Sequence, residues 1–357
     1  MKWWRGKTPG SEYPSTTGDP VLALPSKQLL IARMSGLYDP ATDSYRWLPD
    51  LTPKFTRHVP WNSVNTGPPL LLADGRTVLI PTTGSVDVYL LDTLTGSSKM
   101  AAPMVYGGGP NARPFLLPSG KVLIVGATKL LGLYDPIADA WTPSSTPTGF
   151  MGTDVGDTMP ETASMAQLPD GDVLVTGTTR DCAKAYRYRW RDGVWSTVAS
   201  LPASVAPNRS VLLLDGRVFV AGGARCGYGD AGMDASDRSF VYDPALDAWS
   251  ERARLNQRRQ GNGLVRLPCG RVLAISGYEA GYTGGPPTLG LELYDPIGDV
   301  WHVVRSKPDE LEMSDFLQPE NAMLMPEGGV MTFGVIKVKP GAPPAYCDDC
   351  QRTVVFR

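Results

Sequence analysis

The chain has 357 residues, of which 42% are hydrophobic and 20% charged, so it can bury a large core and is not expected to be disordered. Its formal charge of −2 gives no basic excess for nucleic acid, and no run of about 18 apolar residues offers a membrane span. The 39 glycines and 33 prolines follow no collagen period, which indicates many turns and favours an all-β protein.

The N-terminal stretch "MKWWRGKTPGSEYP" lacks the apolar segment of a signal peptide. We therefore expect a cytoplasmic protein with no membrane segment. Five cysteines in a chain of this length do not indicate a disulfide framework.

Seven predicted β-hairpins recur along the chain. In each, two apolar runs flank a short polar pair such as Ser119-Gly120 or Asp215-Gly216, which is a strong signal for a tight turn. The copies are "LALPSKQLLIA" at 22, "LLLADGRTVLI" at 70, "FLLPSGKVLIV" at 115, "AQLPDGDVLVT" at 166, "LLLDGRVFVAG" at 212, "VRLPCGRVLAI" at 265 and "MLMPEGGVMTF" at 323. Their turn glycines are about 51 residues apart, which matches a repeat of about 50 residues.

A second repeated string lies between these hairpins. It reads "LYDPATDSYRW" from Leu37, "LYDPIADAWTP" from Leu133, "VYDPALDAWSE" from Val241 and "LYDPIGDVWHV" from Leu293. The Asp-Pro start and the later Asp predict a turn that joins a third strand to a fourth. A Tyr and a Trp seven residues apart, as in Tyr134 and Trp141, are predicted to pack between neighbouring sheets. The other clear pairs are Tyr242 with Trp249 and Tyr294 with Trp301, and the altered forms are Tyr38 with Tyr45 and Tyr188 with Trp195.

This combination resembles the kelch superfamily of β-propellers, which includes the galactose-oxidase type. Gly222-Gly223, Tyr242 and Trp249 match the glycine pair, the third-strand Tyr and the fourth-strand Trp of that family, and the resemblance covers essentially the whole chain. It implies a single domain over residues 1–357: a seven-bladed β-propeller of four-stranded blades. The last hairpin is followed by only one strand, "TVVFR", so the N-terminal "KWWRG" is predicted to supply the missing strand and close the ring.

The connections predict which face carries function. Turns within each strand pair are uniformly tight, whereas all the long connections fall on the opposite face. They are 224–239, 278–290 and 336–352 between middle strands, and 48–64, 142–160 and 303–318 between blades. Long irregular connections on a rigid scaffold usually carry binding, so we expect the site on that face.

Polar residues precede each innermost strand and are predicted to ring the mouth of the central channel. They are Asp19, Asn65, Asn111, Arg113, Glu161, Asn208, Arg209, Arg259, Gln260, Asn262, Glu320 and Asn321. Arginine forks among them suit an anionic or polar ligand. The alternative interpretation is that they form ion pairs and amide caps between blades.

The chemistry that this chain could perform is limited by its residue types. A copper-radical oxidase of the resembling superfamily needs two histidines, two tyrosines and a cysteine, but only His58 and His302 are present and neither lies in a Tyr-His pair. A single "CDDC" at 347–350 is half of a zinc site at most. We therefore expect no metal and no cofactor.

Two functions remain open. The first is a monomeric binding or scaffold propeller that recognises a protein or a small polar or anionic ligand, through Asp19, Asn65, Arg113, Asn208, Arg209, Arg259, Asn262 and Asn321. The alternative is a cofactor-independent isomerase, lyase or cyclase in which Glu161, Glu320 or His58 performs acid–base chemistry. Fold alone does not decide between them.

Overall fold

A computed structural model gives the architecture of the chain. It describes residues 3–5, 21–31, 36–42, 44–48, 68–79, 87–105, 113–126, 131–145, 164–177, 184–203, 205–207, 209–225, 234–279, 288, 290–304, 316–324, 330–335 and 351–356. All regular structure in these residues is β-strand or turn.

Six blades are each built from one continuous stretch of chain, with four antiparallel strands in each. Blade 1 has β2 (Val21–Ala23), β3 (Leu29–Ile31), β4 (Gly36–Asp39) and β5 (Ser44–Trp47), and blade 2 has β6 (Leu70–Leu71), β7 (Arg76–Leu79), β8 (Tyr89–Asp92) and β9 (Ser98–Met100). Blade 3 has β10 (Arg113–Leu116), β11 (Val122–Val125), β12 (Gly132–Asp135) and β13 (Ala140–Pro143).

The remaining blades follow the same order. Blade 4 has β14 (Ser164–Gln167), β15 (Val173–Thr176), β16 (Ala185–Arg189) and β17 (Val194–Val198), and blade 5 has β19 (Ser210–Leu212), β20 (Val218–Ala221), β22 (Ser239–Asp243) and β23 (Ala248–Arg252). Blade 6 has β24 (Gly263–Arg266), β25 (Val272–Ile275), β26 (Leu291–Asp295) and β27 (Val300–Val304). The short strands β18 (Val205–Ala206) and β21 (Ala224–Arg225) pair separately.

A further four-stranded sheet, the terminal sheet, combines both ends of the chain. It orders β28 (Phe316–Leu324), β29 (Val330–Val335), β30 (Gln351–Phe356) and β1 (Trp3–Arg5), with Trp4 opposite Val355. The predicted all-β propeller with four-stranded blades is confirmed, and so is the pairing of the N-terminal strand with the last strand. The prediction of seven blades is not confirmed: the described residues form six blades of continuous chain, and the terminal sheet is a further four-stranded sheet made from both chain ends.

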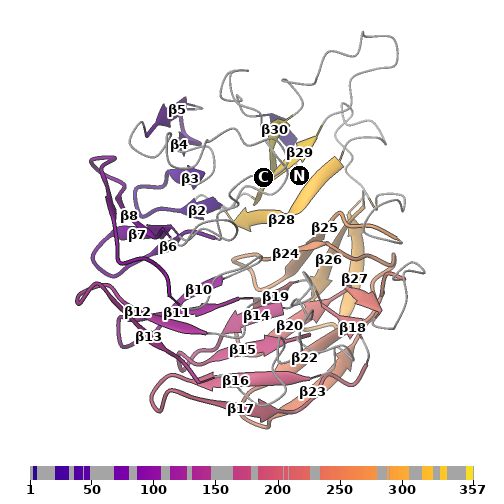
Figure 1. The fold of residues 1–357 in the computed structure, drawn as a ribbon. Helices are drawn as coiled ribbons and strands as arrows, with labels where there is room; N and C mark the ends of the chain where they lie inside the picture. Colours follow the sequence, from indigo (N-terminus) through magenta and orange to yellow (C-terminus); the bar gives the residue numbers. More distant parts are fainter. Residues whose placement is uncertain are drawn as a thin grey trace.

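The sheets are arranged radially. In Figure 1 the first strands β2, β6, β10, β14, β19, β24 and β28 lie towards the middle of the molecule, and the fourth strands β13, β17, β23 and β27 lie towards its outside. Both chain ends lie beside β29 and β30.

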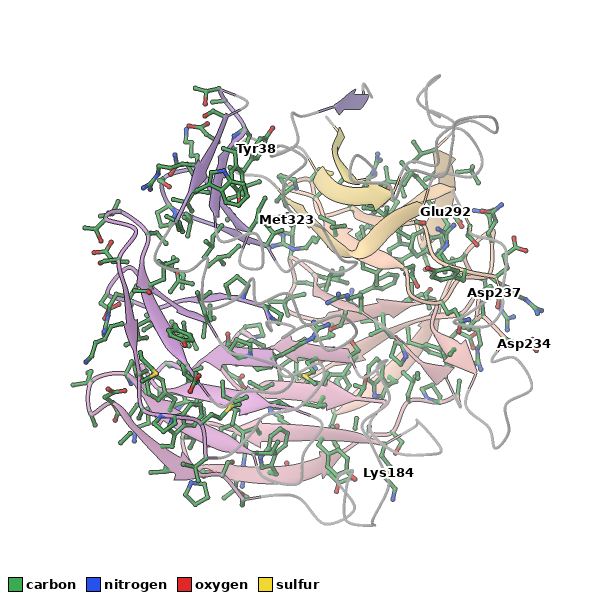
Figure 2. All side chains as sticks on the ribbon, turned by 45° about the horizontal axis from the view of Figure 1, so that its top comes forward. Tyr38, Lys184, Asp234, Asp237, Glu292 and Met323 are labelled. Atoms are coloured by element: carbon green, nitrogen blue, oxygen red, sulfur yellow. The ribbon has the colours of Figure 1, made fainter. Side chains whose placement is uncertain are left out.

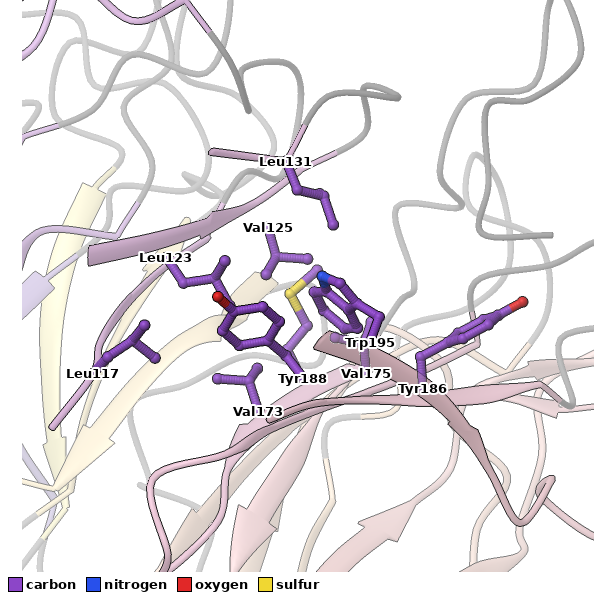
Figure 3. Close-up of a cluster of buried hydrophobic side chains, with 10 residues drawn as sticks. Leu117, Leu123, Val125, Leu131, Val173, Val175, Tyr186, Tyr188 and Trp195 are labelled. Atoms are coloured by element: carbon purple, nitrogen blue, oxygen red, sulfur yellow. The ribbon is translucent and has the colours of Figure 1, made fainter. Parts of the chain in front are cut away.

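Apolar side chains fill the space between neighbouring blades. Between blades 3 and 4, Leu123 and Val125 pack against Val175, Tyr188 and Trp195, as Figure 3 shows. Because successive strand residues alternate between the two faces of a sheet, each blade packs apolar residues against both neighbours. Trp301 is buried, whereas Trp141 and Trp249 are partly buried and pack at the edges of such clusters.

The two ends of the strands define two faces. The tight-turn face carries the hairpin turns, whose glycines take positive φ angles: Gly75, Gly120, Gly171, Gly216 and Gly270. The loop-rich face lies at the opposite ends of the strands, where the first strands begin and the second strands end. The site described next lies on the loop-rich face.

Candidate functional site

The structure describes only some of the residues that the sequence predicts for the channel mouth. Asp19, His58, Asn65, Glu161 and Asn208 lie outside the described residues. Glu320 and Asn321 lie in β28, of which only the backbone is described at these positions. The predicted roles of all seven stay predictions.

Three polar residues mark the start of the first strands in blades 3 to 5. Arg113 opens β10, Ser164 opens β14, and Arg209 directly precedes β19. Arg113 lies opposite Val125 and Ser164 lies opposite Thr176, so the two positions are equivalent in their blades. Both arginines are half-buried and interact within the chain. We call this set, with Thr176, the rim.

Two hydroxyl groups of the rim stand out. The side chains of Ser164 and Thr176 are buried, and neither hydroxyl has a hydrogen-bond partner within the part of the chain that the structure describes. Buried hydroxyls nearly always have a partner, so a pair without one indicates a water molecule or a ligand atom at this position.

An ion pair lies inside blade 6. Arg259 and Glu292 have exposed side-chain fractions of 0% and 1%, and Arg259 Nη2 donates to Glu292 Oε1 at 2.5 Å. Glu292 Oε2 also accepts from Asn256 N at 2.7 Å and from Asn256 Nδ2 at 2.8 Å. Burial lowers the pKa of Arg259, whereas the carboxylate of Glu292 opposes that effect. A buried pair needs such additional hydrogen bonds to offset its desolvation.

Backbone hydrogen bonds join the connections around this pair. Gly223 N donates to Arg259 O at 2.9 Å, Arg259 N donates to Ser236 O at 3.0 Å, and Gln260 and Tyr278 exchange two bonds of 2.9 Å. We call the residues 222–224, 235–238, 256–260 and 276–279 the platform. Figure 2 shows Asp234, Asp237 and Glu292 on the same side of the molecule.

Arg259 and Asn262 are more enclosed than the sequence predicts. Asn262 has an exposed fraction of 1%, and its Nδ2 donates to Ala221 O at 3.3 Å. Both side chains therefore make their observed contacts inside the chain, which agrees with the alternative interpretation of ion pairs and amide caps. The proposed ligand contacts of these two residues gain no support from this arrangement.

Sequence reasoning did not identify Glu292. The signal was present in "LELYDP", where a charge occupies the position two residues before the repeated Tyr. The equivalent residues are Tyr186 in blade 4 and Phe240 in blade 5, both buried. A carboxylate at a position that is otherwise apolar or aromatic predicts a buried partner, and Arg259 is that partner.

The metal chemistry of the superfamily was tested against the side chains. Within the described ranges, no group of three His, Cys, Asp or Glu residues could hold a metal ion. His302 is exposed on the fourth strand β27, and Cys269 is exposed in the turn between β24 and β25. These residues do not fit a copper site, so no step through copper is derived. Cys347 and Cys350 lie outside the described residues.

Comparisons with known proteins agree with this architecture. No protein-family profile matches the chain. Kelch-like protein 23 from Mus musculus is 30% identical over 108 residues, which are 30% of this chain and 18% of that protein. The F-box/kelch-repeat protein At1g22040 from Arabidopsis thaliana is 29% identical over 126 residues, which are 34% of this chain and 26% of that protein. The matches thus span about a quarter or less of the length of these relatives.

A solved structure shows the same fold. It is described as "Novel fungal alcohol oxidase with catalytic diversity among the AA5 family, in complex with copper", and its superposition covers 100% of this chain and 75% of that chain. The TM-score is 0.70 and the identity is 16%, so the likeness concerns the fold alone.

The sheets define a β-propeller of four-stranded blades, and the local similarity to kelch-repeat proteins supports a propeller of the kelch type. The resemblance to the kelch and galactose-oxidase superfamily, inferred from the glycine pair, the Tyr and the Trp, is confirmed. None of the residues that the structure describes forms a helix long and apolar enough to cross a membrane.

Proposed function

We propose that this chain is a protein-interaction scaffold that binds its partner on the loop-rich face. The observation that carries the proposal is the platform, in which connections of blades 5 and 6 form one hydrogen-bonded surface. Asn256, Gln257 and Arg258 are exposed there, next to the buried pair of Arg259 and Glu292. Exposed polar groups on an ordered support suit protein recognition, because little side-chain and backbone freedom is lost on binding.

The kelch-repeat relatives support this function, since kelch propellers generally bind protein partners. Charges of both signs lie on the platform and directly beside it. Arg254 lies 3.5 Å from both Asp237 and Glu251, whereas the exposed Arg258 has no ion pair among the described residues. We expect Arg258 to meet a carboxylate of the partner, because an exposed guanidinium binds carboxylates through two parallel hydrogen bonds.

We also propose that the terminal sheet closes the ring as a seventh blade. Two contacts support closure. Met323 of β28 packs on the cluster of Leu29, Ile31 and Tyr38 in blade 1, and Val330 of β29 packs on Val265 and its neighbours in blade 6. A closed ring leaves no exposed blade face, so it would hold the loop-rich face rigid.

A small polar or anionic ligand at the rim is a second candidate, favoured by the buried hydroxyls of Ser164 and Thr176 in blade 4 and by the half-buried Arg209 at the start of the first strand of blade 5. The enzyme alternative rests on Glu161, Glu320 and His58, whose side chains lie outside the described residues, so no mechanism is built on it. The cytoplasmic location and the monomeric state also stay predictions.

Affinity capture from cells that produce this chain tests the scaffold function. Arg258→Glu reverses a charge on the platform, and Lys27→Glu makes the matched change at an exposed turn of the tight-turn face. A partner retained by Lys27→Glu and lost by Arg258→Glu supports the proposal. Partners that follow the opposite pattern would place binding on the wrong face and refute it.

A further inference from the structure

We propose that Arg259 is a positioning residue that couples the middle-strand connections of blades 5 and 6, so that the platform responds as one recognition surface. That this surface recognises a partner rests on the proposed function, whereas the coupling between the two connections does not. The coupling follows from four contacts made by the side chain and the backbone of this one residue, together with the buried carboxylate that fixes them.

The backbone of Arg259 holds the connection of blade 5. Its N–H donates to Ser236 O at 3.0 Å, and its carbonyl accepts from Gly223 N at 2.9 Å. Gly223 belongs to the limb that leaves β20, and Ser236 belongs to the limb that returns to β22. The two limbs also bind each other, because Ser236 N donates to Gly223 O at 2.8 Å.

The side chain of Arg259 holds the connection of blade 6. Nη1 donates to Ser276 O at 3.0 Å and to Gly290 O at 2.8 Å. Ser276 directly follows β25 and begins the limb that leaves it, and Gly290 directly precedes β26. The planar guanidinium therefore spans both limbs of the second connection, in the way that its fixed fork of donors allows.

Glu292 keeps this guanidinium in place. Its Oε1 binds Arg259 Nη2, while Oε1 and Oε2 accept from the backbone N–H groups of Gln257 at 3.2 Å and Asn256 at 2.7 Å. Arg259 lies in the connection between β23 and β24, and the carboxylate fixes two further residues of that connection to the same network. Because both charges are buried, neither can leave the pair without exposing an uncompensated charge to the interior.

Two glycines let these segments approach without a side chain between them. A Cβ atom on Gly222 would lie 2.6 Å from Arg259 O, and one on Gly277, where φ is +115°, would lie 2.8 Å from Gln260 O. Any residue other than glycine would clash there, so the two glycines permit the close backbone approach that brings Arg259 and Gln260 against both connections. This close approach explains why glycine follows the second strand in blades 5 and 6.

Hydrogen exchange measured by mass spectrometry on the full chain tests the coupling. The variants are Arg259→Met, Glu292→Met and the double variant Arg259→Met/Glu292→Met. The single variants leave one buried charge unpaired, and the double variant leaves none, so its thermal stability should return towards that of the wild type. Met cannot donate to Ser276 O or Gly290 O, so the double variant separates positioning from charge burial.

We expect the double variant to exchange at least tenfold faster than the wild type in both connections, in 222–225 and 234–239 of blade 5 and in 276–279 and 290–291 of blade 6, with no change in β7, β11 and β15. Arg187→Met/Asp172→Met is the matched control, since it removes an ion pair of 2.7 Å in blade 4 and should alter neither connection. Faster exchange in only one connection, or wild-type protection in both, overturns the inference. Should a single variant fail to fold, the double variant still decides.

This result is distinguishable from the fate of the proposed function, because the exchange experiment needs no partner. Coupled exchange together with partner capture that Arg258→Glu leaves unchanged would refute binding at the platform and keep the coupling. If exchange is uncoupled and Arg258→Glu abolishes partner capture, the coupling is refuted and binding at the platform is supported.

Discussion

Tyr294 donates its hydroxyl hydrogen bond to Asp299 Oδ1 at 2.7 Å, and the same oxygen accepts Ala253 N at 3.0 Å from the end of the preceding blade. Trp301 Nε1 completes the contact by donating to Ala253 O at 3.0 Å. Blade 3 repeats the arrangement with Tyr134, Asp139, Trp141 and Ala102, and blade 5 repeats it with Tyr242, Asp247, Trp249 and Ala199. The repeated Tyr, Asp and Trp therefore join each of these blades to its neighbour.

Asp299→Ala should lower the free energy of unfolding by about 1–3 kcal/mol, because it leaves the buried Tyr294 hydroxyl and the Ala253 N–H without their acceptor. Ile297→Ala is the control, since Ile297 occupies the same turn and is 96% exposed. Urea unfolding followed by tryptophan fluorescence measures both. Equal urea midpoints for the two variants would show that the hydrogen bonds of Asp299 do not stabilise the contact between the blades.

Blade 4 offers the reverse experiment, since Gly193 occupies the position of this Asp. Gly193 has a φ of 67°, close to the 49° of Asp139 and Asp299, so an Asp fits the backbone there. A Cβ atom on Gly193 would lie 3.7 Å from the Tyr188 hydroxyl, within reach of a carboxylate. Gly193→Asp should be more stable than Gly193→Ala by about 0.5–1.5 kcal/mol, which is the contribution of one added hydrogen bond.

Gly193→Ala supplies the comparison, because it keeps the left-handed backbone strain and adds no carboxylate. We expect it to be less stable than the wild type by about 1 kcal/mol. If the Asp variant is no more stable than the Ala variant, no hydrogen bond has formed across the blade.

Local patterns predicted the fold well, because each blade is specified by its own turns. Asp215-Gly216 and the Asp-Pro turns need particular backbone angles, and the Tyr and Trp spacing sets the face that packs. The sequence left the orientation of the polar residues at the channel mouth open. A strand start moved by one residue exchanges the two faces, so the sequence could not show that Arg259 turns inward.

The partner of Arg259 was also out of reach of local patterns. Glu292 lies 33 residues further along the chain, and only the pairing of blade 6 brings the two side chains together. The rim residues Arg113 and Arg209 were placed correctly at the starts of first strands. Their role in ligand binding stays a prediction, because strand register gives position and not chemistry.

Acid stability should depend on Asp139. Its pKa is lowered chiefly by the hydrogen bond from Ala102 N, with further contributions from Tyr134 and Lys99. A carboxyl group whose pKa is lower in the folded state stabilises the fold above its unfolded pKa of about 3.9, and this contribution is lost as the pH falls through the folded value. Asp139→Asn keeps the acceptor oxygen but cannot titrate.

We therefore expect the wild type to lose more stability than Asp139→Asn between pH 5 and pH 2. Urea unfolding at several pH values measures the difference, and Asp192→Asn in an exposed turn serves as the control. Parallel curves for the wild type and Asp139→Asn would show that the Ala102 contact is not formed.

Removal of residues 1–6 should destabilise the whole molecule, because β1 supplies the outer strand of the terminal sheet. The exposed edge of β30 would then be open to other strands, and aggregation should rise. A synthetic peptide of residues 1–8, added in excess, should restore the melting temperature. A truncated protein with an unchanged melting temperature would show that the N-terminal strand is dispensable.

The rim can be tested with small anions. Citrate and inorganic phosphate are suitable probes for thermal-shift titration, since both place acceptor oxygens near guanidinium and hydroxyl groups. If either binds between blades 4 and 5, Ser164→Ala and Arg209→Ala should each reduce the shift, while Lys27→Glu should not. Identical shifts in all variants would exclude the rim as the binding site.

Hydrogen exchange of this chain, measured with and without a captured partner, tests binding on the loop-rich face most directly. We expect added protection in 222–224, 235–238, 256–260 and 276–279 of the platform, and none in the tight turns around Gly75, Gly120, Gly216 and Gly270. Protection of those turns with an unchanged platform would contradict binding on the loop-rich face.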